Sequence, residues 1–229
     1  MNQQNIYRIL KSDYPKLLLI SALAFYLAFI PHSNYPYPVH LDEWMHMACS
    51  NEIIKEASTV GLTDPFTGQG IHGNQIFEVG FHLFWAIFHQ ISGISWLTIF
   101  KYFPSIVFMF TVLSAYVLGR RQGFGWEAAL LTCLIPTTVG ILGPGFLVPV
   151  AMGLVCIPLS LFVAFNFGTI LSYLVLFIFV LFLVSLHPPS AICLVIILIP
   201  YVVLNVRGNF KHSAGVTLAI VIPFVAPLP

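Results

Sequence analysis

The sequence predicts an all-α fold, a polytopic transmembrane helix bundle of about seven or eight membrane helices with one long external loop. Of its 229 residues, 59% are hydrophobic and only 7% are charged, whereas soluble domains carry roughly 25% charged residues. A run of 79 uncharged residues separates Glu127 from Arg207, enough for about four spanning helices of roughly 20 residues each. Such continuous runs are too long for the strands of a membrane β-barrel.

This composition excludes several classes of protein. An ordinary soluble enzyme has a higher charged fraction, and a disordered chain combines low hydrophobicity with high net charge. The formal net charge of +1 leaves no broad basic surface for a nucleic acid. The 4 cysteines form no CxxC pair, so neither a disulfide framework nor a zinc ribbon is expected. We therefore expect an integral, multi-pass protein of the cell membrane.

The first span is expected at 17–31, directly after the basic residues Arg8, Lys11 and Lys16. A basic segment before an apolar run resembles a signal peptide, but no clear cleavage site of small residues follows. We therefore interpret this segment as a retained membrane helix. Basic residues stay on the cytoplasmic side of a membrane, which places the next segment, 32–79, outside.

Glycine, proline and asparagine divide the remaining apolar sequence into further helices. We expect them at 80–92, 95–119, 126–142, 146–165, 168–186, 190–206 and 214–229. The whole chain, 1–229, then forms a single membrane domain made of the first span, the loop 32–79 and the helix bundle 80–229. Because the chain ends in apolar sequence without a polar tail, we expect either a piece of a longer protein or a shortened one.

The length of the helix expected at 80–92 leaves open on which side of the membrane the later loops lie. Its 13 residues reach only ~20 Å, short of a hydrocarbon core of ~30 Å. Basic residues follow at Arg120, Arg121, Arg207 and Lys211. They lie outside if the helix crosses completely, and return to the cytoplasm, as the positive-inside rule favours, if the helix is short or re-entrant. An extension into 93–98 would allow a full crossing.

The loop 32–79 is the one long polar segment, and it holds six of the 8 acidic residues. A loop of this length is usually functional. Within it, the pattern from Asp42 to Ala57 predicts a short amphipathic surface helix with Asp42 as its N-cap. The expected membrane-facing residues are Trp44, Met45, Ala48, Ile53 and Ile54, and the expected water-facing residues are Glu43, His46, Glu52 and Glu56.

Asp42, Glu43 and His46 are the first group of candidate site residues. Both acids lie about one helical turn from His46, so they are placed to share a proton or a metal ion with it. The segment differs from the zinc-protease motif HExxH because Asp42 stands at the first histidine position. The structural alternative is that Asp42 caps the helix and Glu43 is solvated.

Glu78, His82 and His187 form the second group. An acid and a histidine one turn apart at the start of an apolar helix are costly unless they are paired, so a mutual Glu78–His82 pair is the structural alternative there. His187 is the only ionisable side chain in its 79-residue run, and Pro188 and Pro189 follow it. An ionisable residue within a span indicates function, whereas one at a helix end is simply solvated.

Five landmarks follow one another between residues 17 and 142. They are Asp42-Glu43, the surface helix 43–57, Phe77–His82, the turn Ser92–Ser95 and the basic stop Leu118–Arg121. Their order and spacing resemble the GT-C superfamily of polytopic glycosyltransferases, which includes protein O-mannosyltransferases, lipid A aminoarabinose transferases and the catalytic subunit of oligosaccharyltransferase. The chain departs from the family in having Val79-Gly80 where a Pro-Pro pair is common, and in being shorter.

The resemblance implies transfer of a sugar from a polyprenyl-phosphate carrier, a membrane lipid, to an acceptor on the non-cytoplasmic side. Asp42 matches the family's catalytic acid, which acts as general base or orients the acceptor, and Glu43 stands beside it. Glu78 matches an acid that binds a divalent metal ion in some members, and His46 is the second candidate metal ligand. Because charge develops on the leaving phosphate, we expect His82 and His187 to contribute there.

Two other classes of protein remain open. A transporter would carry ionisable residues through several spans and broken helices in paired repeats, and the sequence has no clear repeat. A scaffold with the same fold and no chemistry is the second alternative. Only the acidic and histidine residues above argue against it, and the sequence identifies neither the sugar nor the acceptor.

Overall fold

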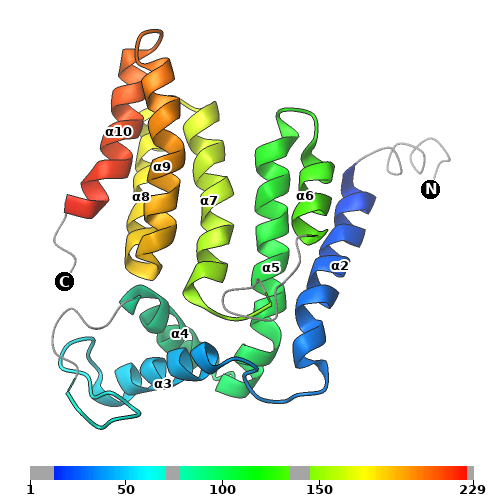
Figure 1. Ribbon diagram of the computed structural model, residues 1–229, viewed down its shortest axis with the longest axis vertical. Coiled ribbons are helices and arrows are strands. Elements are labelled where there is room, and N and C mark those ends of the chain that lie inside the picture. The colour runs from blue at the N-terminus through cyan, green and yellow to red at the C-terminus, as the bar shows by residue number, and fades with distance from the viewer. Residues whose placement is uncertain (1–12, 71–77, 135–144, 226–229) are drawn as a thin grey trace.

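The computed structural model describes residues 13–70, 78–134 and 145–225 (Figure 1). These residues form nine α-helices, and within them the one β-type contact is an isolated bridge between Thr63 and Gly70. The helices are α2 (Asp13–Ser33), α3 (Leu41–Glu56), α4 (Val79–Ser92), α5 (Trp96–Arg120), α6 (Gly125–Leu134), α7 (Pro149–Asn166), α8 (Ile170–Leu186), α9 (Pro188–Asn205) and α10 (Phe210–Val225). The described chain is therefore all-helical, as predicted.

Seven of the described helices, α2 and α5 to α10, stand side by side as a bundle, whereas α3 and α4 lie across one end of it (Figure 1). Helix α5 packs against α2, α6 and α7, and α8 packs against α7, α9 and α10. Helix α4 contacts both α3 and α8. The helix predicted at 80–92 therefore belongs to the layer that covers one end of the bundle.

Four of the described helices, α2, α5, α7 and α9, are long and apolar enough to cross a membrane. Helices α6, α8 and α10 are apolar but shorter. The chain is therefore an integral membrane protein with several spans, as its composition predicts. Length and composition by themselves do not confirm the expected seven or eight spans.

Most helix boundaries lie close to the predicted ones. The first span begins at Asp13, before the expected residue 17, and α10 begins at Phe210, before the expected residue 214. Helix α7 begins at Pro149, because Val148 before it is extended. The predicted helical residues 135–142 and 226–229 lie outside the described residues.

The turn after α4 shows whether this helix extends into 93–98, as a full crossing would require. Gly93 adopts a left-handed conformation with φ 67°, and its N–H donates to the carbonyl of His89, which ends α4 at Ser92. Ser95 then caps α5 by accepting the N–H of Thr98. The 14 residues of α4 measure ~21 Å, less than a hydrocarbon core of ~30 Å. The extension into 93–98 therefore does not form.

At the end of the bundle that faces away from α3 and α4, polar contacts join neighbouring helices. The hydroxyl of Tyr116 in α5 donates to Asp13 at the start of α2, at 3.1 Å. Arg121, directly after α5, donates to Asn166 at the end of α7, also at 3.1 Å. The turn between α9 and α10 lies at the same end (Figure 1). The basic residues of this end are Lys16, Arg120, Arg121, Arg207 and Lys211.

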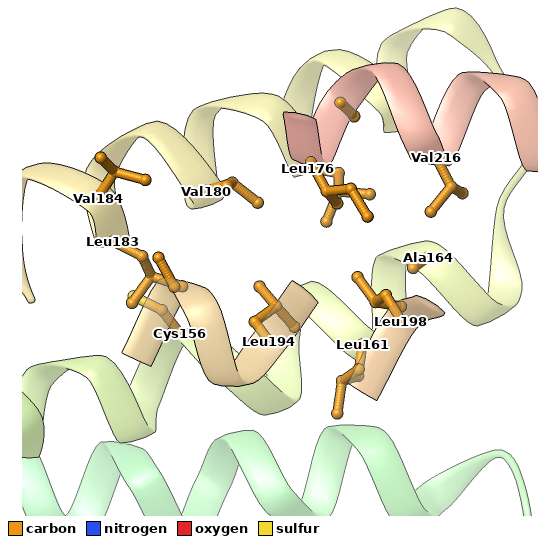
Figure 2. Packing of buried hydrophobic residues seen from close by; sticks show 13 residues of the cluster. Cys156, Leu161, Ala164, Leu176, Val180, Leu183, Val184, Leu194, Leu198 and Val216 are labelled. Atoms are coloured by element: carbon orange, nitrogen blue, oxygen red, sulfur yellow. The ribbon is translucent and has the colours of Figure 1, made fainter. Parts of the chain in front are cut away.

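Buried apolar side chains fill the space between α7, α8, α9 and α10 (Figure 2). Leu176, Val180 and Leu183 of α8 cluster with Leu194 and Leu198 of α9, and none of the five is exposed. In a membrane such helices associate through close packing, because lipid tails are as apolar as the side chains. A second cluster holds α4 against α5, α7 and α8 and so fixes the covering layer on the bundle.

Candidate functional site

Helix α3 begins with a capping box formed by His40 and Glu43. The Nδ1 atom of His40 accepts the N–H of Asp42 at 3.2 Å, and Oε2 of Glu43 accepts the N–H of His40 at 3.2 Å. The prediction of Asp42 as the N-cap is therefore wrong, because His40 occupies that position. The carboxylate of Asp42 stays outside the cap and is 37% exposed, with one oxygen 3.5 Å from Nδ1 of His40.

Glu43 is fully buried, contrary to the expectation that it faces water. Val39 donates its N–H to Oε2 at 2.8 Å, in addition to His40, and Leu147 donates its N–H to Oε1 at 2.9 Å. Burial raises the pKa of Glu43, and the three backbone N–H groups oppose that rise. The residue therefore anchors the segment before α7 to the start of α3, and its predicted catalytic role stays a prediction.

The side of α3 that was expected to face water is mostly buried, because protein covers Glu43, His46 and Glu52. Trp44 and Met45, which were expected to face the membrane, are not covered by protein. Helix α4 packs against α3 on its polar side, so protein covers the face that was expected to meet water. Glu56, at the end of the helix, is exposed as predicted.

His46 of α3 and His82 of α4 form a buried pair, with Nδ1 of His46 2.9 Å from Nε2 of His82. The alternative in which His82 pairs with Glu78 is not what the structure shows, because α3 brings His46 to it instead. Burial, and secondly the neighbouring His82, lower the pKa of His46 to about 3. Burial lowers the pKa of His82 to about 4. Both rings are therefore neutral near pH 7, and one donates to the other.

Glu78 precedes α4 in a left-handed backbone conformation, with φ 68° and ψ 31°. This conformation is uncommon for a residue with a side chain and costs of order 1–3 kcal/mol. The carboxylate does not cap its own helix, and Oε1 lies 3.4 Å from Nε2 of His187. Burial, and secondly the charge of Asp42, raise the pKa of Glu78 to about 7. Asp42 and Glu78 therefore lie close enough to repel each other.

His187 forms the turn between α8 and α9, and only 13% of its side chain is exposed. Its Nδ1 atom accepts the N–H of Ser190 at 3.2 Å, which makes His187 the N-cap of α9. Burial lowers the pKa of His187. The residue is thus held by Glu78 and Ser190, and the alternative of a freely solvated helix end is wrong.

All six predicted site residues lie at the end of the bundle that α3 and α4 cover: Glu43 in the capping box, and Asp42, His46, Glu78, His82 and His187 in a polar cluster. The charges of Asp42 and His187 both act on the pKa of His46, which shows that the groups from α3, α4 and the α8–α9 turn influence one another. Two carboxylates and three imidazoles in one place suit proton transfer and hydrogen bonding to an oxygen-rich ligand.

The predicted metal site is not assembled. Within the described parts of the chain, no three His, Cys, Asp or Glu side chains are placed to hold one metal ion. His46 is bonded to His82, and Glu78 is paired with His187, so the two predicted ligands have different partners. We therefore derive no step through a divalent ion.

Two cavities lie near this cluster. A groove of about 270 Å³ between α4, α5, α7 and α8 is lined by apolar side chains throughout, among them Trp85 and Phe182. Trp85 lies about one helical turn from His82, and Phe182 lies about a turn and a half before His187. A second pocket of about 520 Å³ lies between the end of α3 and α4. The groove and the polar cluster thus share the helices α4 and α8, although no residue of the cluster lines the groove.

No family model matches the chain, and no curated protein is significantly similar to it. The resemblance to the GT-C superfamily depends on the landmarks in the sequence. The geometry adds that the acids Asp42 and Glu78, which the resemblance singled out, lie at the same end of the bundle.

Proposed function

We propose that the chain is a GT-C-like glycosyltransferase that moves a sugar from a polyprenyl-phosphate carrier to an acceptor on the non-cytoplasmic face. The observation that supports it most is the convergence of Asp42, Glu78 and His187, from three separate elements, at one end of a membrane bundle. The neighbouring groove is apolar throughout. A polar centre beside an apolar groove suits a substrate with a charged head and a hydrocarbon tail.

In this proposal α3 and α4 lie on the external face of the cell membrane. The basic residues at the opposite end then lie in the cytoplasm, as the positive-inside rule favours. Helices α2, α5 and α7 to α10 cross the membrane, α6 with its 10 residues enters it from the cytoplasmic end, and the short α4 does not cross. This arrangement removes the conflict that a crossing at 80–92 would create.

Asp42 is the general base of the proposed reaction. Its carboxylate is partly exposed and takes no part in the helix cap, so an acceptor hydroxyl can reach it. Asp42 takes the proton of that hydroxyl while the hydroxyl oxygen attacks the anomeric carbon of the sugar. The bond from the anomeric carbon to the phosphate oxygen breaks with inversion, and its electron pair leaves with the phosphate.

The histidines act on the leaving phosphate. Negative charge develops on that group, and hydrogen-bond donors in a site with little water stabilise it. His187 is held by Glu78, and within the described residues no group pairs with the buried Nδ1 atom of His82. His82 therefore has a nitrogen atom to offer to a phosphate oxygen, whereas His187 would share its Nε2 atom between Glu78 and the phosphate.

The substitution Asp42→Asn tests the proposal, because it keeps the size of the side chain and removes the base. Transfer is measured in lipid vesicles that contain the purified chain, a series of polyprenyl-phosphate sugars, and a lipid and protein extract of its own membranes as the acceptor source. We expect turnover to fall at least about 10²-fold, the contribution typical of a general base. Expression and the midpoint of thermal unfolding should stay unchanged.

Glu56→Gln is the matched control, because Glu56 is an exposed acid on the same helix. This variant should transfer sugar at the rate of the unaltered chain. Full turnover in Asp42→Asn would remove Asp42 from the mechanism. No transfer by the unaltered chain from any carrier in the series would contradict the proposed function as a whole.

A further inference from the structure

Ser190 is the first residue of helix α9 that has a backbone N–H to donate. Pro188 and Pro189 occupy the first two helical positions and contribute no backbone N–H. The N–H of Ser190 is therefore the first donor at this helix end that needs a partner. It donates both to the carbonyl oxygen of His187 at 3.0 Å and to Nδ1 of His187 at 3.2 Å, and the hydroxyl oxygen of Ser190 lies 2.7 Å from Nδ1.

The two contacts at Nδ1 define where the imidazole carries its proton. A backbone N–H is a donor only, so Nδ1 of His187 has to present its lone pair to it. A neutral imidazole carries one proton, which then lies on Nε2. Nε2 is the atom 3.4 Å from Oε1 of Glu78, so the N–H of His187 faces the carboxylate.

Ser190 is itself held in place by α7. Its side chain is 4% exposed, and Gly153 lies against it. A Cβ atom on Gly153 would lie 2.5 Å from the hydroxyl oxygen of Ser190, closer than real Cβ contacts come. The absence of a side chain at position 153 therefore leaves room for the hydroxyl beside Nδ1 of His187.

We propose that Ser190, backed by Gly153, is a positioning residue that holds His187 as the Nε2–H tautomer. The ring then presents a donor, in a fixed direction, to Glu78 and to a phosphate oxygen bound beside it. The role of that donor in catalysis rests on the proposed function, whereas the tautomer itself does not.

Nitrogen-15 NMR of histidine-labelled protein in lipid nanodiscs tests the assignment. The couplings of each ring nitrogen to the ring protons identify the protonated nitrogen, and the signal that is lost in His187→Gln identifies His187. The unaltered chain should show a proton on Nε2 and none on Nδ1. Ser190→Ala loses the hydroxyl contact and leaves Nδ1 only the backbone N–H of residue 190, which the carbonyl oxygen of His187 also accepts at 3.0 Å. We therefore expect a measurable fraction of the Nδ1–H tautomer in this variant.

Ser172→Ala is the matched control, because Ser172 is the third residue of α8 as Ser190 is of α9. Helix α8 begins at the end of the bundle opposite to His187. This control should leave the signal of His187 unchanged. A proton on Nδ1 in the unaltered chain would overturn the proposal even if Ser190→Ala does not fold. An unchanged tautomer in folded Ser190→Ala would also overturn it.

The rate of sugar transfer separates this proposal from the proposed function. If Ser190 positions His187 for catalysis, Ser190→Ala should lower kcat about tenfold and leave KM for the carrier nearly unchanged. The NMR result could hold in a chain that transfers no sugar, and in that case the proposed function alone would fail.

Discussion

The adjacent acids at the start of α3 have different roles because they occupy different positions in the first helical turn. The first N–H groups of a helix have no partner within it, and a carboxylate at the third position folds back onto such groups. Glu43 stands at that position and accepts three backbone N–H bonds. Asp42 stands one residue earlier, outside the box, and its carboxylate remains 37% exposed.

Glu43→Ala should destabilise the protein without acting on the chemistry. Each backbone N–H left buried and unpaired costs about 1–3 kcal/mol, so we expect a loss of at least about 2 kcal/mol. The midpoint of thermal unfolding in detergent, followed by tryptophan fluorescence, measures it. The exposed Glu56, replaced by Ala, should change the stability by less than about 0.5 kcal/mol. Equal midpoints for the two variants would contradict the anchoring role of Glu43.

At the scale of the elements, the site depends on a close crossing between α4 and α8. A Cβ atom on Gly80 would lie 2.8 Å from the backbone carbonyl carbon and oxygen of Ser185, which real Cβ atoms essentially never do. Only glycine therefore allows this approach. The approach sets the start of α4 against the end of α8, where Glu78 meets His187 at 3.4 Å.

Gly80→Ala should push α4 away from α8. Alanine is preferred over glycine in a helix by up to about 1 kcal/mol, but overpacking costs about 1–3 kcal/mol, so the steric effect should prevail. We expect a lower unfolding midpoint and, if the proposed function holds, at least a tenfold loss of sugar transfer. Gly208→Ala is the control, since its nearest atom, the carbonyl oxygen of Asn205, is 3.9 Å away. Wild-type behaviour of Gly80→Ala would show that this crossing does not position Glu78.

At the scale of the whole molecule, the two ends of the bundle differ in charge. The covering layer at one end contains α3 and α4 with most of the acidic residues, and the turns at the other end contain basic residues. Because α4 ends at Gly93 and lies with α3 across one end of the bundle, α5 starts at the same end as α3. The charge asymmetry and the short α4 therefore favour one orientation in the membrane.

Cysteine labelling tests this orientation. Single cysteines replace Phe66, which is 62% exposed between α3 and α4, and Gln122, which is exposed after α5. The native cysteines are first replaced by alanine. A membrane-impermeant maleimide should label position 66 in intact cells, and position 122 only after the membrane is permeabilised. Labelling of both positions in intact cells would mean that α4 crosses after all.

Helix positions were predictable from the sequence because they depend on local properties. Apolar runs interrupted by glycine and proline gave boundaries close to those observed, and Gly93 and Ser95 marked the turn between α4 and α5. Glu78 and His187 stood out as ionisable residues in or beside apolar sequence. Burial was harder to predict, since the faces of α3 depend on the packing of α4, which the pattern of one helix does not contain.

The sequence by itself determined that this protein is a helical membrane protein and which ionisable residues are candidates for a site. Only the tertiary structure decided their partners: His46 with His82, 36 residues apart, and Glu78 with His187 across two helices. The physical reason is that hydropathy and capping act over a few residues of one chain segment. A buried polar group instead takes whichever partner the packing of separate helices brings within hydrogen-bond distance.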